Sequence, residues 1–193
     1  MFSLQLSHLF SSRLMRPLAL LAVAALSAPG AALASSPWTG GGSMGAIDES
    51  CYLAVQMDNS EARLAPGLLL PCRIRYQVTD SFGSMSTATL AMFAHIRDNS
   101  VTAGKVVVRL YEYPNSGTTP AGNLMATIDS DTLAGTPIAA TGFTRYRFPA
   151  ACAGAMNLNF TANTYWIEVD MTPALLPALP GLAIGSLQLR NCS

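Results

Sequence analysis

The residues best suited to chemistry lie in one segment, NTYWIEVDM at 163–171. Apolar residues alternate along it, which predicts a half-buried β-strand with Trp166, Glu168 and Asp170 in a row on its second face. An exposed tryptophan offers a flat surface to a sugar ring. The two carboxylates would lie about 6.6 Å apart, within the range of an inverting glycosidase pair. The row is therefore a candidate glycan-binding site or the acid pair of a hydrolase.

A structural explanation competes with both. The segment TRYRF carries Arg145 and Arg147 opposite its apolar side chains. If this segment pairs antiparallel with the first, its arginines face Glu168 and Asp170 across the ladder, in exposed pairs that contribute about 0.2–1 kcal/mol each. We favour this interpretation, in which the row is the solvated face of a sheet and Trp166 packs more readily than it binds sugar.

Other catalytic patterns are weak. His95 is the only histidine beyond the N-terminal 34 residues, and a triad with Asp98 and a serine remains open because triads assemble in space. No nucleophile elbow, which is a G-x-S-x-G motif at a turn from a strand into a helix, is recognised in support of it. We therefore assign no catalytic residue and no cofactor, and an enzymatic function is the alternative rather than the first hypothesis.

Calcium is the most reasonable metal. MDNSE offers Asp58 and Glu61, and IDSD offers Asp129 and Asp131, all with the oxygen ligands that calcium accepts. Neither segment completes an EF-hand loop, and Asp also caps turns by bonding nearby backbone. We expect turns at both places and keep the four carboxylates as weak calcium candidates.

The elements that position these residues are predicted to be short antiparallel strands. Gly and Pro recur at turn spacing, and no segment shows a long 3.6-residue repeat, so the chain is predicted to be an all-β sandwich of about eight strands. Jelly-roll-like and immunoglobulin-like strand orders both remain open. A slip in alternation at Gly185 predicts a bulge. The expected strands are 51–57, 72–78, 89–97, 105–113, 124–129, 144–148, 164–171 and 182–190.

The N-terminal residues are predicted to lie outside the fold. Arg13 and Arg16 precede a short apolar run and a small-x-small end at Ala32 and Ala34, the three parts of a secretory signal peptide over 1–34. The apolar run is too short to span a bilayer. A Gly/Ser-rich, flexible lead-in is expected over 35–50, and a single domain over 51–193.

All four cysteines lie beyond the predicted signal. An even number in an exported chain predicts disulfides, and we expect the nearest-neighbour pairs Cys51–Cys72 and Cys152–Cys192. Zinc would require closely spaced cysteine pairs, which the sequence lacks.

The amino-acid composition narrows the possible classes of function. Basic and acidic residues number 11 each, and Lys105 is the only lysine, so nothing concentrates the positive charge that nucleic-acid binding needs. We expect a secreted or periplasmic, non-catalytic module with no membrane span after signal removal, which binds a glycan or protein partner or serves as a surface or envelope component. A secreted hydrolase and a self-assembling extracellular subunit are the alternatives. No motif identifies one family.

Overall fold

The structure is a computed structural model that describes residues 38–81, 90–98, 104–117, 122–139, 141–174 and 181–192. The chain divides into two units, Met1–Ala34 and Ser35–Ser193. The predicted signal peptide coincides with the first unit and lies outside the described residues, so it stays a prediction.

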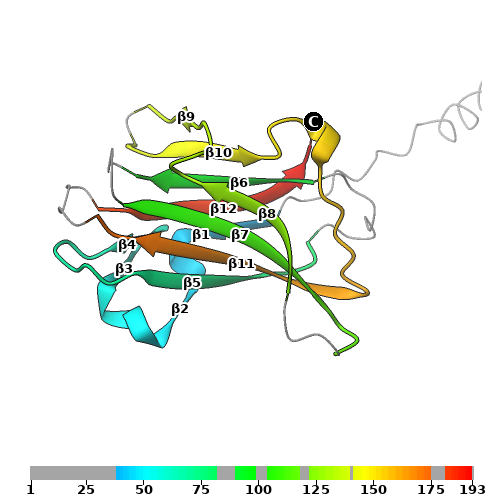
Figure 1. The fold of residues 1–193 in the computed structure, drawn as a ribbon, viewed down its shortest axis with the longest axis horizontal. Helices are drawn as coiled ribbons and strands as arrows, with labels where there is room; N and C mark the ends of the chain where they lie inside the picture. Colours follow the sequence, from blue (N-terminus) through cyan, green and yellow to red (C-terminus); the bar gives the residue numbers. More distant parts are fainter. Residues whose placement is uncertain are drawn as a thin grey trace, which may run out of the picture. The chain divides into compact units, whose positions relative to one another are not determined.

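The second unit is all-β and consists of two antiparallel sheets (Figure 1). The seven-stranded sheet has the order β3-β4-β12-β6-β10-β9, with β1 also paired to β12, and the five-stranded sheet has the order β2-β5-β11-β7-β8. The seven-stranded sheet comprises β1 (Trp38–Gly41), β3 (Val55–Asp58), β4 (Glu61–Leu64), β6 (Leu90–Arg97), β9 (Thr136–Pro137), β10 (Thr144–Phe148) and β12 (Ala183–Asn191). The five-stranded sheet comprises β2 (Ala46–Ile47), β5 (Cys72–Val78), β7 (Lys105–Pro114), β8 (Asn123–Asp129) and β11 (Asn163–Thr172). Three short 3-10 helices, η1 (Gly42–Met44), η2 (Glu49–Ala54) and η3 (Cys152–Gly154), complete the described elements.

Alternation of apolar side chains explains why these segments pair as sheets. On β5, the residues at 72, 74, 76 and 78 are buried while those between them are not, and β11 buries Tyr165, Ile167, Val169 and Met171 completely. Because successive side chains on a strand point to opposite faces, one face of each sheet meets the other in a shared core. The outer face of each sheet lies outside this core.

The main sequence-based predictions of the fold are confirmed. The domain is an antiparallel β-sandwich, and the disulfides are Cys51–Cys72 and Cys152–Cys192. The predicted bulge is also present, because the β12–β6 register shifts between Ile184 and Ser186. Among the described residues, no helix has the length and apolar character needed to span a membrane.

Two predictions about the N-terminal part were wrong. The expected strand over 51–57 begins only at Val55, because its first four residues belong to η2, where Leu53 is exposed. The expected lead-in over 35–50 contains β1, η1 and β2, and its two strands pair with one strand in each sheet. Gly42 shows why this segment belongs to the sandwich: a Cβ there would lie 1.9 Å from the Ile184 carbonyl oxygen, so only glycine lets the backbone approach so closely.

Candidate functional site

The predicted row of Trp166, Glu168 and Asp170 lies on the outer face of the five-stranded sheet. It is carried by β11, which pairs with β5 on one side and β7 on the other (Figure 1). Glu168 is almost buried, with 8% of its surface exposed, whereas Trp166 and Asp170 are partly exposed. The row thus sits at the middle of a rigid sheet rather than on a loop.

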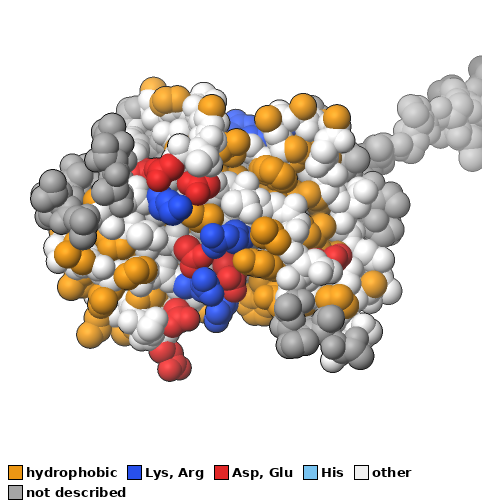
Figure 2. Space-filling view, viewed as in Figure 1, with side chains coloured by type: hydrophobic (Ala, Val, Ile, Leu, Met, Phe, Trp, Pro, Cys, Tyr) orange, Lys and Arg blue, Asp and Glu red, His pale blue; other side chains and the backbone are white. Residues whose placement is uncertain are grey.

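Both carboxylates are held by arginines of the neighbouring strands. Arg73 donates from Nε and Nη2 to the two oxygens of Asp170 at 2.7 and 3.3 Å, and Arg109 of β7 also donates to Asp170. Arg75 donates to Glu168 at 3.0 Å, and Arg73 Nη1 lies 3.6 Å from Glu168. Figure 2 shows the resulting band of acidic and basic side chains across this face. The hydrogen bond to Asp170 is the main reason that the pKa of Arg73 is raised.

The predicted partners were wrong although the predicted residue type was right. TRYRF forms β10, which pairs with β6 and β9 in the other sheet, so Arg145 and Arg147 do not face Glu168 and Asp170. The arginines that do so come from CRIRYQV and KVVVRLYEY. In both segments they alternate with buried residues, which places them on the same outer face.

The described lining of the hollow beside the charged band includes only one of the two carboxylates. A hollow of about 360 Å³ lies next to the charged band, and Asp170 lines it together with Arg73, Arg109 and Lys105, but Glu168 does not. A glycosidase pair must lie on two sides of the scissile bond. Both carboxylates instead bond to arginines, which is the arrangement of a structural ion-pair network.

Aromatic side chains continue the outer face beyond the charged band. Tyr111 is the register partner of Trp166, and the rings of Tyr111 and Tyr113 lie 6.4 Å apart with a tilt of 47°. All three are partly exposed, and we call them the aromatic row. Gln77 is the register partner of Trp166 on its other side, so an amide borders the row. Sequence reasoning identified Trp166 but missed the two tyrosines, which follow Arg109 on the same face of β7.

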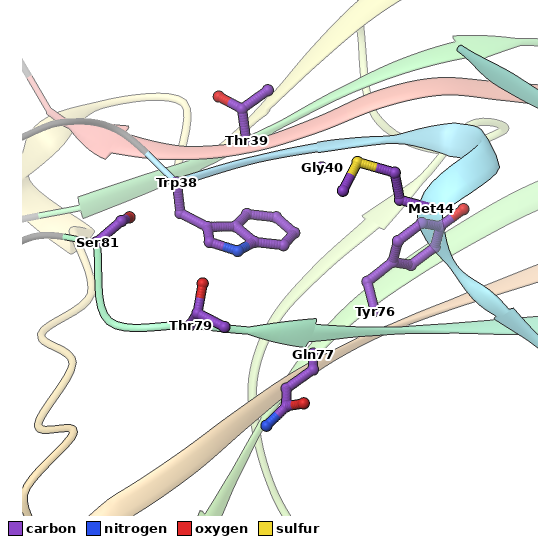
Figure 3. A pocket seen from close by; sticks show the side chains of 8 residues that line it. All are labelled: Trp38, Thr39, Gly40, Met44, Tyr76, Gln77, Thr79 and Ser81. Atoms are coloured by element: carbon purple, nitrogen blue, oxygen red, sulfur yellow. The ribbon is translucent and has the colours of Figure 1, made fainter. Parts of the chain in front are cut away.

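A cleft of about 390 Å³ opens at the edge of the sandwich (Figure 3). The Trp38 indole projects from β1 into the space toward β5, with Met44 and Tyr76 at one end and Thr79 and Ser81 across from it. We call this the Trp38 cleft. Tyr76 is fixed by donating to the Gly42 carbonyl at 2.6 Å, and burial raises the pKa of its phenol.

Gln77 connects the Trp38 cleft to the aromatic row. It lines the cleft and is also the register partner of Trp166. Sequence reasoning missed the cleft because Trp38 lies in the segment that was predicted to be flexible. A lone tryptophan among glycines and serines was the available signal, since so large an apolar side chain usually packs against something.

The calcium candidates lie in two separate places, and one carboxylate in each place, Glu61 and Asp129, has a structural partner. Asp58 and Glu61 face each other where β3 turns into β4, and Glu61 accepts from Arg97 at 2.8 Å. Asp129 accepts from the backbone of Asp131 at 3.0 Å, as a turn cap does. Within the described ranges, no group of three or more His, Cys, Asp or Glu side chains could hold a metal ion.

The remaining catalytic candidate, His95, lies on the outer face of the seven-stranded sheet. Its Nδ1 is 2.9 Å from the Ser186 hydroxyl, while Asp98 accepts from the Ser130 hydroxyl at 2.5 Å. Partial burial, and then the positive charge of Arg145, lower the pKa of His95. These contacts give His95 and Asp98 different partners.

The sequence matches no protein-family model and no curated protein. Among solved structures, the chain is similar to the one described as "Structural and thermodynamic dissection of specific mannan recognition by a carbohydrate-binding module, TmCBM27". The identity is 14%, the match covers 82% of this chain and 87% of that chain, and the TM-score is 0.34. A likeness this low supports no conclusion about a ligand or a site in this chain.

Proposed function

We propose that the chain is an exported, non-catalytic β-sandwich module that binds a glycan on the outer face of its five-stranded sheet. The observation that supports this is the aromatic row, in which Trp166 and Tyr111 lie on adjacent strands of one rigid face. Sugar rings present apolar C–H faces that stack on aromatic rings, and a few fixed polar groups then bind the hydroxyls.

Polar side chains flank the aromatic row on both sides. Gln77 lies beside Trp166 on β5, and Arg109 precedes Tyr111 by two residues on the same face of β7. Arg109 is held by Asp170, so it would lose little conformational entropy when it binds a hydroxyl. Fixed donors next to flat rings suit an uncharged sugar chain. A chain that crosses Trp166 toward Gln77 reaches the rim of the Trp38 cleft.

Binding to a glycan array tests the proposal. Trp166→Ala and Tyr111→Ala should each reduce retention of the bound glycan about tenfold or more, because each removes a stacking surface. Tyr52→Ala is the matched control, since Tyr52 is 67% exposed on η2, outside the aromatic row. Retention that is unchanged in both test variants, or equally reduced in the control, would contradict the proposal.

Export is supported by the two disulfides, which form and persist in oxidising compartments. We propose cleavage of the signal after Ala34. N-terminal sequencing of the exported protein should begin at Ser35. A product that retains the first residues would contradict this cleavage.

Self-assembly is a second candidate function, and one observation favours it. The loop between β4 and β5 exposes Leu68, Leu69 and Leu70 by 39, 52 and 55%, beside the Cys51–Cys72 disulfide. Neighbouring exposed leucines are typical of a surface that contacts another protein. Light scattering of the mature chain should then show a second copy bound. Leu69→Ser should weaken the association of the two copies. A monomer at high concentration would exclude this function.

A further inference from the structure

Three arginines surround one buried ring on the outer face of the seven-stranded sheet. The guanidinium carbons of Arg145, Arg190 and Arg147 lie 4.7, 5.0 and 5.6 Å from the centre of the Phe93 ring. Phe93 lies on β6, and its neighbours β10 and β12 carry the arginines. The ring is only 4% exposed although it points away from the core, which shows how closely the arginine stems cover it.

These arginines differ from all the other basic residues beyond the predicted signal. Of nine such residues, all of which are described, six form an ion pair with Asp or Glu. The three that form none with any described carboxylate are those around Phe93. Sequence composition alone, with its balanced charge, gave no sign of this segregation.

The donors of this cluster are only partly used. Arg147 Nη2 donates to the sulfurs of Cys152 and Cys192 at 3.1 and 3.0 Å, and sulfur is a weak acceptor. Its Nε is buried and has no hydrogen-bond partner in the part of the chain that the structure describes. Arg145 and Arg190 are exposed, and a guanidinium that stacks on a ring keeps its in-plane N–H donors available.

No described carboxylate forms an ion pair that would compensate the positive charge of the cluster. Because all three guanidinium carbons lie close to one ring centre, no two of them are more than about 11 Å apart, near the Debye length of roughly 8–10 Å at physiological ionic strength. Like charges at this spacing repel one another. One oxyanion among them would turn the repulsion into attraction and supply acceptors to the donors.

We propose that Arg145, Arg147 and Arg190 form a binding site for a sulfate or phosphate ester group of an acidic polysaccharide. The three planar forks around Phe93 match the several oxygens of such a group. This site lies on the other sheet and shares no residue with the proposed glycan site. A failure of the glycan proposal would therefore leave this proposal intact.

Two other polyanions fit less well. Membrane surfaces are bound by about four to eight basic residues, commonly with apolar side chains that insert. This cluster has three, and none of the exposed large hydrophobic side chains among the described residues belongs to β6, β10 or β12. Nucleic acid would require a longer basic track than three arginines around one ring.

Titration calorimetry of the mature, oxidised chain with heparin as the sulfated probe tests the site. We expect binding that weakens as salt rises, and a loss of about tenfold or more in Arg145→Gln/Arg190→Gln. Both positions are exposed, so this variant should fold. Arg63→Gln/Lys105→Gln removes the same charge elsewhere and should keep the affinity within about twofold.

Two further readouts separate the site from general attraction of a polyanion. Inorganic sulfate should shift the NMR signal of the Arg147 Nε–H and raise the pKa of His95, because it neutralises the field of Arg145. The proposal is overturned if heparin does not bind, if the control loses as much affinity as the test variant, or if inorganic sulfate moves neither signal. Binding to phosphatidylglycerol vesicles without binding to heparin would assign the face to a membrane and overturn it as well.

Discussion

The ion-pair network under the predicted site can be tested through one carboxylate. Glu168→Gln keeps the size of the side chain and one acceptor oxygen but removes the charge. Glu168 accepts from Arg75 at 3.0 Å and lies 3.6 Å from Arg73. Its side chain is 11% exposed, whereas those of Arg73 and Arg75 are 42 and 47% exposed.

These exposures set the expected magnitude. A hydrogen bond to a charged group contributes roughly 1.5–3 kcal/mol when it is well shielded. Arg73 and Arg75 are half-exposed, so water can replace much of the contribution of these hydrogen bonds. The expected contribution therefore moves toward the 0.2–1 kcal/mol of exposed ion pairs. We expect a loss of about 1 kcal/mol in the free energy of unfolding, or roughly 2–4 °C in Tm for a domain of this size.

Urea denaturation at low and high salt is the assay. The loss should shrink at 1 M NaCl, and a double-mutant cycle with Arg75→Gln should give a coupling energy of about 0.5–1 kcal/mol. A loss above about 3 kcal/mol that does not respond to salt would show a buried charge pair instead. A coupling energy of zero would refute the assignment of Arg75 as the main partner.

Three further predictions concern the framework. Replacing both cysteines of the Cys152–Cys192 pair by alanine should lower the free energy of unfolding by about 4 kcal/mol, because the bridge closes a 40-residue loop. Calorimetry measures this loss of stability, and an unchanged Tm would contradict the prediction. Gly42→Ala should lower it by about 2 kcal/mol or more, since the added Cβ meets the Ile184 carbonyl, whereas a lead-in outside the fold would tolerate the change. The pKa of His95 is lowered in the folded chain, so the unfolded chain binds a proton at this residue more tightly. The free energy of unfolding should therefore decline as pH falls below about 6.5. In His95→Gln this decline, measured between pH 7 and 5, should be smaller.

The sequence predicts the parts of this fold that depend on local patterns. Alternation along CRIRYQV and NTYWIEVDM predicts both strands and which side chains face outward, because the side-chain period of a strand is fixed by backbone geometry. The same local logic predicts the bulge at Gly185. Alternation misled only where CYLAVQM begins, since a 3-10 helix can place the same cysteine in the core.

Pairing between distant strands is not encoded in such patterns. The sequence indicates that Glu168 faces an arginine, but Arg75 and Arg147 satisfy the same alternation rule, and only the strand order distinguishes them. The candidate site was therefore predicted in its residues and missed in its neighbours. Tyr111 was missed for the same reason, since it gains its role from Trp166, which lies on a strand far away in the sequence.

The distribution of charge gives this strand order a functional consequence. Had TRYRF paired with β11, Arg145 and Arg147 would have neutralised the carboxylate row and left the arginines of β5 without partners. The observed order instead pairs the charges on the face with the aromatic row, and it places around Phe93 the arginines that pair with no described carboxylate. An aromatic face with paired charges suits an uncharged sugar chain, whereas a cationic face whose arginines pair with no described carboxylate suits an anionic one. The two faces should therefore differ in salt dependence: binding at the aromatic row should change little between 50 and 500 mM NaCl, and binding at the Phe93 cluster should fall steeply. Equal salt dependence at both faces would show that the segregation of charge does not determine what each face binds.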